Sequence, residues 1–213
     1  QDNYTDAVIW ELHVRDFSID ETSGMTNKGK FLAFTEEGTT VPGTDIKTGV
    51  DYMVDLGVNY VHLLPVYDIN SVDEKTGGYN WGYDPKNYNV PEGSYSTDPY
   101  NGAVRVNEFK QMVQSLHNNG IGVIMDVVYN HVADAGQFCF NQIVPGYFSR
   151  IHDDGSYQSN SGCGNDTASE RSMVSKYIVD SVLYWNTEYH IDGFRWDLVG
   201  LIDYETINAV MEA

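Results

Sequence analysis

The sequence is poor in basic residues and has no long apolar stretch. Lys and Arg together number 12 against 31 Asp and Glu, so the 213 residues carry a formal net charge of −19. A chain this acidic repels phosphate backbones and anionic lipid, which argues against a nucleic-acid or membrane partner. No apolar run approaches the roughly 20 residues that a membrane-spanning helix needs. Aromatic residues make up 13% of the chain, which favours a folded protein over an acidic disordered one.

Cysteine is also scarce, with only Cys139 and Cys163 in a stretch rich in glycine, serine and asparagine. Neither has a second Cys or His at ligand spacing, so no metal site is expected on them. A disulfide between them would suit a secreted protein and two free thiols a cytoplasmic one, so the pair leaves the compartment open. The acidity is compatible with a secreted or cell-surface protein, which is our expectation, with the cytoplasm as the alternative.

Four short apolar runs, rich in β-branched and aromatic residues, predict four β-strands. Three of the runs are nearly continuous, which is typical of parallel strands covered on both faces. Apolar residues at helical spacing predict helices that end at a glycine or a polar turn. We expect strands at residues 7–14, 58–65, 121–128 and 191–196, and helices at 45–56, 104–118, 169–189 and 203–213.

Strand and helix alternating four times predict an α/β fold with a parallel sheet. The connections at residues 66–103 and 130–168 are unusually long, and both follow the carboxyl ends of strands, where such folds place their sites. No linker rich in proline or serine divides residues 1–213, so we expect one domain. A (β/α)₈ TIM barrel typically takes about 250 residues, so the chain is expected to hold about four βα units, the N-terminal half of a barrel.

Polar side chains follow two of the predicted strands. Asp126, Asn130 and His131 lie at the end of the third strand, and Arg195 and Asp197 at the end of the fourth. Because side chains in a strand alternate, Arg195 and Asp197 face the same side. A carboxylate held beside a guanidinium suits a nucleophile on a sugar carbon. Alternatively, Asp126 and Arg195 form a purely structural ion pair; two such clusters beside two long loops favour the functional interpretation.

The first long connection contains the stretch GGYNWGYDP at residues 77–85. Flat aromatic rings can stack on sugar faces and amides can bind hydroxyls, so this stretch predicts a carbohydrate platform. The alternative is a tyrosine-rich loop folded on itself. A nucleotide site is disfavoured because no GxGxxG or GxxxxGK[ST] is present, and a serine hydrolase because no GxSxG is present.

Together these motifs resemble the α-amylase family of glycoside hydrolases, family 13, over essentially the whole chain. Residues 126–131 resemble the first conserved region of that family and residues 193–197 the second. The stretch YNWGYDP at 79–85 is similar to a motif of type I pullulanases and related α-1,6 debranching enzymes, and residues 9–18 and 162–171 resemble the same subgroup.

The resemblance implies a role for each matching residue. Asp197 would be the nucleophile and Arg195 would keep it charged and oriented. The remaining residues would contact or shape the sugar site: His131 through a sugar hydroxyl, Tyr83 through ring stacking, Asp126 by anchoring Arg195, and Asn80, Trp81 and Asp84 by forming subsites. Asn130 corresponds to a calcium ligand of many α-amylases; we predict no metal site on these residues and no cofactor, with calcium in the full enzyme as the alternative.

The implied function is hydrolysis of α-1,6-glucosidic linkages in pullulan, starch or glycogen-type glucans by a retaining double displacement. This mechanism needs a second carboxyl group, which the family places at the end of its fifth strand. The four predicted units do not include that strand, so the 213 residues alone are expected to be inactive and to self-associate or need the other barrel half. The alternatives are an α-1,4-acting amylase-type hydrolase and a non-catalytic α-glucan-binding module.

Overall fold

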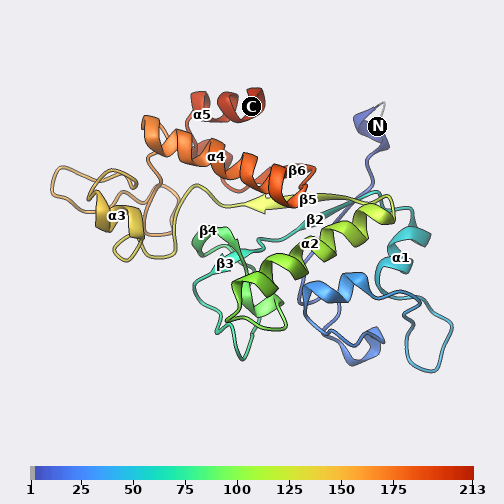
Figure 1. Cartoon of the computed structure of the whole chain (residues 1–213). Coiled ribbons are helices and arrows are strands. Elements are labelled where there is room, and N and C mark those ends of the chain that lie inside the picture. Colours follow the sequence, from blue (N-terminus) through green and yellow to red (C-terminus); the bar gives the residue numbers. More distant parts are fainter. Residues whose placement is uncertain (1–2) are drawn as a thin grey trace.

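A computed structural model describes residues 3–213 and contains a parallel sheet in the strand order β1-β2-β5-β6 (Figure 1). Its strands are β1 (Ile9–Leu12), β2 (Tyr60–Leu63), β5 (Gly122–Val127) and β6 (Gly193–Trp196). A small antiparallel sheet pairs β3 (Tyr67–Ile69) with β4 (Pro85–Pro91). The α-helices are α1 (Gly49–Leu56), α2 (Gly102–Asn118), α3 (Cys139–Ile143), α4 (Ser172–Tyr189) and α5 (Tyr204–Glu212), and short 3₁₀ turns cover Tyr4–Asp6, Glu21–Ser23, Phe31–Thr35, Gly93–Tyr95 and Val199–Leu201.

Local sequence signals explain where these helices begin and end. The side chain of Asn101 accepts a hydrogen bond from the Ala103 N–H and caps α2. The side chain of Asp203 caps α5 in the same way, through the N–H groups of Glu205 and Thr206. Helix α1 ends at Gly57, whose φ of 80° is left-handed and suits glycine.

The structure confirms the four predicted strands and the helices that follow them, with boundaries shifted by up to four residues. Helix α1 begins at Gly49 instead of residue 45, because Thr40 and Lys47 form a β-bridge and the N–H of Val41 donates to the carbonyl of Ile46. The predicted start of this helix is therefore wrong, and Ile46, which the predicted range 45–56 included, lies before α1 with an exposed side chain.

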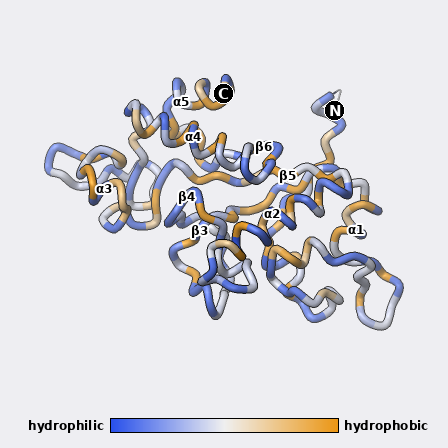
Figure 2. The backbone as a smooth tube through the Cα atoms, viewed as in Figure 1, coloured by the Kyte–Doolittle hydropathy of each residue, from blue (hydrophilic) through white to orange (hydrophobic). Residues whose placement is uncertain are grey.

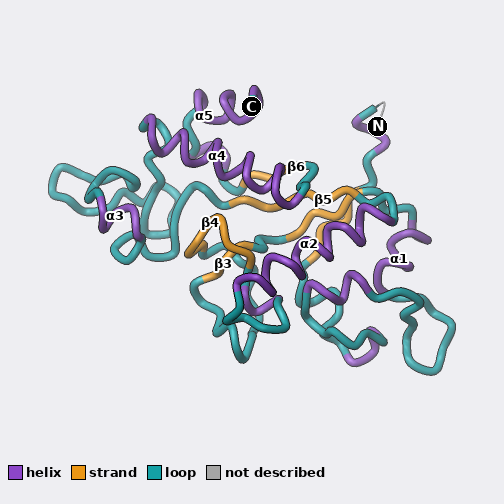
Figure 3. Tube along the Cα trace, in the orientation of Figure 1, coloured by secondary structure: helices purple, strands orange, loops and turns teal. Residues whose placement is uncertain are grey.

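The two long connections contain structure that the sequence did not predict. The pair β3–β4 lies in the first and the short helix α3 in the second, within extended loop segments (Figure 3). Strand β4 reads PKNYNVP, which lacks apolar alternation and has a proline at each end. Its pairing with β3 depends on a tertiary contact: the fully buried carboxylate of Glu92 accepts hydrogen bonds from the N–H groups of Ile69 and Ser94.

Only one face of the parallel sheet is fully covered within residues 3–213. Val61, Leu63, Val123 and Met125 are completely buried, whereas the residues between them are partly exposed. Figure 2 shows the sheet as a hydrophobic centre with more hydrophilic helices and loops around it. The expectation that both faces are covered is met on the helix side, and the opposite face carries the polar side chains described below.

Two further findings concern the described residues as a whole. Within residues 3–213, no helix has the length and apolar character needed to cross a membrane. Cys139 and Cys163 are both exposed and no disulfide joins them. That residues 1–213 form one domain stays a prediction, and residues 1 and 2 lie outside the described part.

Candidate active site

The predicted polar residues converge at the carboxyl ends of β5 and β6. Asp126 on β5 is paired in register with Arg195 on β6. The Nη1 atom of Arg195 lies 3.0 Å from each carboxylate oxygen of Asp126 and 3.1 Å from Oδ1 of Asp197. Although burial acts to lower it, the pKa of Arg195 is raised by the hydrogen bond and charge of Asp126. A permanently charged guanidinium therefore bridges two carboxylates.

The carboxylate of Asp197 is held from both sides. Arg195 donates to Oδ1, and Nδ2 of Asn130 donates to Oδ2 at 3.0 Å and to the Asp197 carbonyl at 2.9 Å. The backbone N–H of Asp197 donates to the carbonyl of Val127, which continues the pairing of β5 with β6. The Asp197 side chain is 16% exposed, so it is accessible but restricted. These contacts fix the orientation of the carboxylate at the sheet mouth.

Asp126 is completely buried and accepts hydrogen bonds from three elements. Besides Arg195, its Oδ2 atom accepts from the hydroxyl of Tyr83 at 2.8 Å and lies 3.2 Å from Nε2 of His62 on β2. Burial and the Asp126 charge raise the pKa of Tyr83, so its hydroxyl stays protonated and donates. The guanidinium of Arg195 lies 6.0 Å from the centre of the Tyr83 ring. These contacts are the geometric basis for the prediction that Asp126 anchors the side chain of Arg195.

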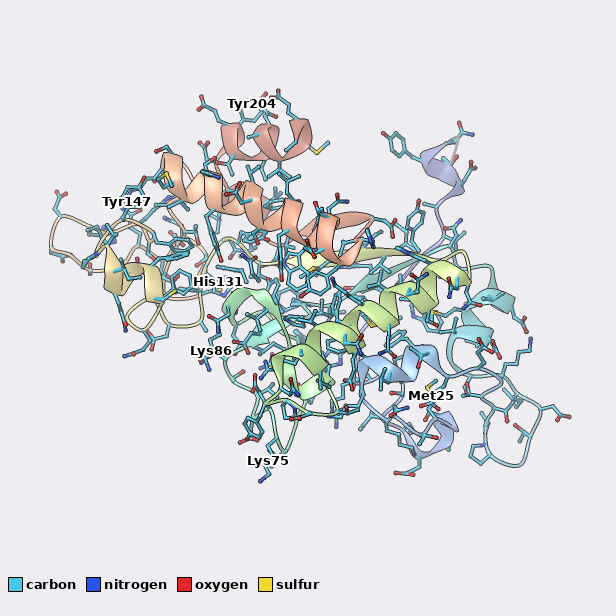
Figure 4. The ribbon with its side chains drawn as sticks, in the orientation of Figure 1. Met25, Lys75, Lys86, His131, Tyr147 and Tyr204 are labelled. Atoms are coloured by element: carbon cyan, nitrogen blue, oxygen red, sulfur yellow. The ribbon has the colours of Figure 1, made fainter. Side chains whose placement is uncertain are left out.

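His131 connects the site to the first long loop. It is buried, with Nε2 2.9 Å from the carbonyl of Tyr83 and Nδ1 2.6 Å from Oδ1 of Asn130. In Figure 4 it lies beside β4, where the second long connection leaves the sheet. Burial lowers the pKa of His131, and the hydrogen bond to Tyr83 opposes this shift. Both ring nitrogens face protein oxygens, so a sugar hydroxyl would have to share one of them; the substrate-binding role stays a prediction.

The remaining predicted residues, Asn80, Trp81 and Asp84, lie in an adjacent open pocket of about 390 Å³, lined also by Ser71, Tyr79 and Tyr83. Trp81 is 60% exposed. Oδ2 of Asp84 accepts from the Ser71 N–H at 2.7 Å and closes the loop at its base. Gly82 has a φ of +89°, and a Cβ there would lie 2.9 Å from the carbonyl oxygen of Pro65, so glycine lets the loop approach the end of β2.

The structure thus places five of the predicted residues in one hydrogen-bonded cluster and three in the neighbouring pocket, with Tyr83 shared by both. The cluster contains Asp126, Arg195, Asp197, Tyr83 and His131. Asn130 bonds to Asp197, and within residues 3–213 no group of three or more His, Cys, Asp or Glu side chains is arranged to hold a metal ion. A larger apolar cavity of about 560 Å³ between α3 and α4 contains none of these residues.

The sequence analysis missed His62 and His13, which both contact the site residues. His62 bonds to Asp126, and Nε2 of His13 lies 2.7 Å from the carbonyl of Asn80. A detectable signal was present: each is a polar residue inside one of the largely apolar runs that predict strands, as are Asp126 and Arg195. A polar residue in a buried strand needs a partner, and its partners here lie at the site.

A parallel sheet of βα units, with a guanidinium-held carboxylate at its carboxyl edge, is an arrangement that (β/α)₈-barrel glycoside hydrolases share. A family model described as the alpha amylase catalytic domain matches residues 41–145. The chain belongs to the α-amylase family, and its fold is α/β of the TIM-barrel type, with four βα units present.

Within that family the chain is similar to pullulanases. It is 50% identical to the pullulanase of Bacillus subtilis and 38% identical to pullulanase 1 of Arabidopsis thaliana, a chloroplastic protein, over 95% and 96% of this chain. It is 56% identical to the crystal structure of the Paenibacillus barengoltzii pullulanase in complex with maltohexaose and alpha-cyclodextrin, with a TM-score of 0.95 over 98% of this chain. The chain spans 28%, 24% and 33% of these proteins, respectively.

Proposed function

We propose that the chain carries the nucleophile side of the active site of a pullulanase-type enzyme, which hydrolyses α-1,6-glucosidic linkages in pullulan, starch or glycogen-type glucans. The observation that carries the proposal is the carboxylate of Asp197, held by Arg195 on one oxygen and by Asn130 on the other beside an aromatic pocket. The similarity to pullulanases supports the choice of linkage.

In this mechanism Asp197 attacks the anomeric carbon and forms a covalent glycosyl-enzyme, while a carboxylic acid protonates the departing glucosidic oxygen. A water molecule, deprotonated by that same carboxyl group, then releases the sugar and regenerates Asp197. A carboxylate oxygen has two lone pairs, so the hydrogen bonds to Asp197 orient it without consuming its nucleophilic capacity. The positive charge of Arg195 keeps the oxygens aligned through both steps.

The acid must lie roughly 5–5.5 Å from the nucleophile in a retaining enzyme. Asp126 is unsuited because it is completely buried and already accepts from Tyr83 and Arg195. Glu205 and Glu212 lie on α5, which packs on α4, away from the sheet mouth (Figure 1). We therefore propose that the acid comes from polypeptide outside these 213 residues and that these residues alone are inactive.

Product analysis tests the proposal. The complete polypeptide that contains this chain should release reducing sugar from pullulan by cleaving α-1,6 bonds and leave linear maltooligosaccharides intact. Cleavage of the linear substrates would favour the α-1,4-acting amylase-type alternative. Binding of α-glucan by the complete polypeptide without release of reducing sugar would favour the binding module. Robust hydrolysis by the 213 residues alone would contradict the proposed source of the acid.

The proposal extends to assembly, because β1 and β6 are the edge strands of the described parallel sheet. We propose that the edges and the partly exposed face are covered by further strands of a barrel or by self-association. Light scattering on the 213 residues should show oligomers or aggregation, and a stable monomer would contradict this.

We also propose, from the net charge of −19, a secreted or cell-surface location. The charge is compatible with an extracellular setting but does not require one, so the cytoplasm is the alternative. Immunodetection in culture medium, surface and cytoplasmic fractions distinguishes the two, and detection only in the cytoplasm would contradict the proposal.

A further inference from the structure

The exposed end of the aromatic loop, residues 79–81, has few attachments to the rest of the protein. The side chain of Asn80 bonds within the loop, to Ser71 and to the N–H of Gly82, and the indole N–H of Trp81 donates to the hydroxyl of Tyr79. Within residues 3–213, one hydrogen bond ties residues 79–81 to an element outside the loop: the contact between the Asn80 carbonyl and His13. The loop end therefore depends on a residue 67 positions away in the chain.

His13 follows β1 and is 7% exposed. The N–H of Asp16 donates to its Nδ1 atom at 3.3 Å, so the proton of the neutral ring lies on Nε2. Nε2 faces the Asn80 carbonyl at 2.7 Å, in the geometry of a donated hydrogen bond. The hydroxyl oxygen of Tyr95 is a second neighbour of Nε2, at 3.1 Å. The tautomer that accepts the hydrogen bond from the Asp16 N–H is therefore the same one that can donate to the carbonyl of Asn80 in the loop.

The His13 ring is also packed against the loop. Its centre lies 5.5 Å from the ring centre of Tyr79 and 5.7 Å from that of Tyr95, which is buried. Tyr95 stacks edge-on against Phe31 of the core, so the sequence of contacts runs from the core through Tyr95 and His13 to the loop end. The buried rings of Tyr95 and Phe31 therefore hold His13 in a fixed position.

We propose that His13 is a positioning residue that sets the orientation of the Tyr79–Trp81 platform and thereby the affinity of the site for α-glucan. The inference rests on the proposed function. His13 does not line the Trp81 pocket and it bonds to neither Asp126 nor Asp197, so it acts through the platform and not on the reacting atoms. Losing the His13 hydrogen bond weakens substrate binding and leaves the chemical step intact.

The sharpest test compares His13→Asn with His13→Gln in the complete polypeptide. The Asn side chain can still accept from the Asp16 N–H but is too short to reach Asn80, whereas the Gln amide can donate to Asn80 from about the position of Nε2. His13→Asn should raise KM for pullulan about fivefold to tenfold and leave kcat within about twofold. His13→Gln should stay within about twofold of the wild type in both constants.

Hydrogen exchange gives a readout that needs no substrate. The amide of Gly82, which donates to the Asn80 side chain at 2.6 Å, should exchange about fivefold to tenfold faster in His13→Asn than in the wild type and at about the wild-type rate in His13→Gln. His117→Gln is the matched control, because His117 bonds to Asp192 at 2.8 Å and does not contact the loop; it should change neither KM nor this exchange. If His13→Asn does not fold, His13→Phe, which keeps an aromatic ring at this position and lacks the donor, takes its place.

Unchanged KM and unchanged exchange in a folded His13→Asn protein would overturn the proposal. A fall in kcat without a rise in KM would also overturn it, because His13 would then act on the chemical step. Absence of α-glucan binding and hydrolysis in the wild type would remove the proposed function instead, and the exchange comparison would still show whether His13 holds the loop.

Discussion

The two faces of the parallel sheet are built from alternating residues of the same strands but are held together by different forces. On the helix-covered face, residues such as Leu63 and Met125 are completely buried in the apolar core. On the opposite face, Nδ1 of His62 lies 4.0 Å from the carboxylate of Glu11, and its Nε2 atom contacts Asp126, which contacts Arg195.

This difference separates two roles: the apolar face contributes mainly to the stability of the fold, and the polar face carries the proposed chemistry. Because side chains in a strand alternate with a period of two, one strand can contribute to a dry core on one face and to a charged network on the other. Pairs of variants that alter one face and leave the other intact test this separation.

The largest effect is expected at the polar face. Asp197→Asn keeps the shape of the side chain and removes its nucleophilic charge, so kcat/KM of the complete enzyme should fall on the order of 10⁴-fold, about 5 kcal/mol of transition-state stabilisation. The unfolding midpoint should change little, because the side chain is not part of the apolar core. Activity assays on pullulan with parallel thermal melts measure both quantities, and retention of a tenth of the activity would exclude Asp197 as the nucleophile.

The next effect is on the helix-covered face. Leu63→Ala leaves a cavity in the core and should lower the free energy of unfolding by about 2–5 kcal/mol. Glu11 lies on the same sheet, but its side chain is 61% exposed. The free energy of unfolding of Glu11→Ala should therefore stay within about 0.5 kcal/mol of the wild-type value. Urea titrations followed by tryptophan fluorescence give both values; equal losses would show that the two faces do not differ in this way.

A smaller effect tests the bridging role of Arg195. The Nη1 atom of Arg195 contacts Asp126 and Asp197 together, and a lysine side chain, which is one bond shorter, does not bring its ammonium group to the same position between the two carboxylates. Arg195→Lys should lower kcat/KM about tenfold to hundredfold with near-normal stability. A KM increase with unchanged kcat would indicate a substrate-binding role in place of the orienting role.

The smallest effect concerns pH. Burial lowers the pKa of His131 below its ordinary value of 6.5. Neutral His131 therefore contributes stability above that pH, and the contribution is lost as the pH falls from 6.5 through the lowered pKa of the folded state. Thermal melts should show a greater loss on acidification in the wild type than in His131→Gln. If hydrogen bonds from the ring nitrogens to Asn130 and Tyr83 stabilised the protonated ring by more than burial destabilises it, the wild type would instead lose less stability on acidification than the variant.

The strand and helix positions were predictable because apolar runs and capping residues are local signals. The convergence of Asp126, Arg195 and Asp197 was also predictable, since carboxyl ends of parallel strands meet at one edge of a sheet. Strand β4 was not predictable, because its pairing depends on the buried Glu92 and not on its own apolar pattern. The exposure of Ile46 was missed for the same reason: a β-bridge outside the helix overrode the helical spacing.

By itself the sequence determined the α/β architecture, the family and the residue types at the sheet mouth, because these follow from periodicity and short motifs. Only the tertiary structure determined which side chains bond to each other. One nitrogen of Arg195 contacts both Asp126 and Asp197, and the side chain of Asn130 bonds to Asp197. His13 contacts the carbonyl of Asn80 at the loop end. Such contacts join residues far apart in the chain, and a hydrogen bond needs its two atoms within about 3 Å of each other, a condition that spacing along the chain does not encode.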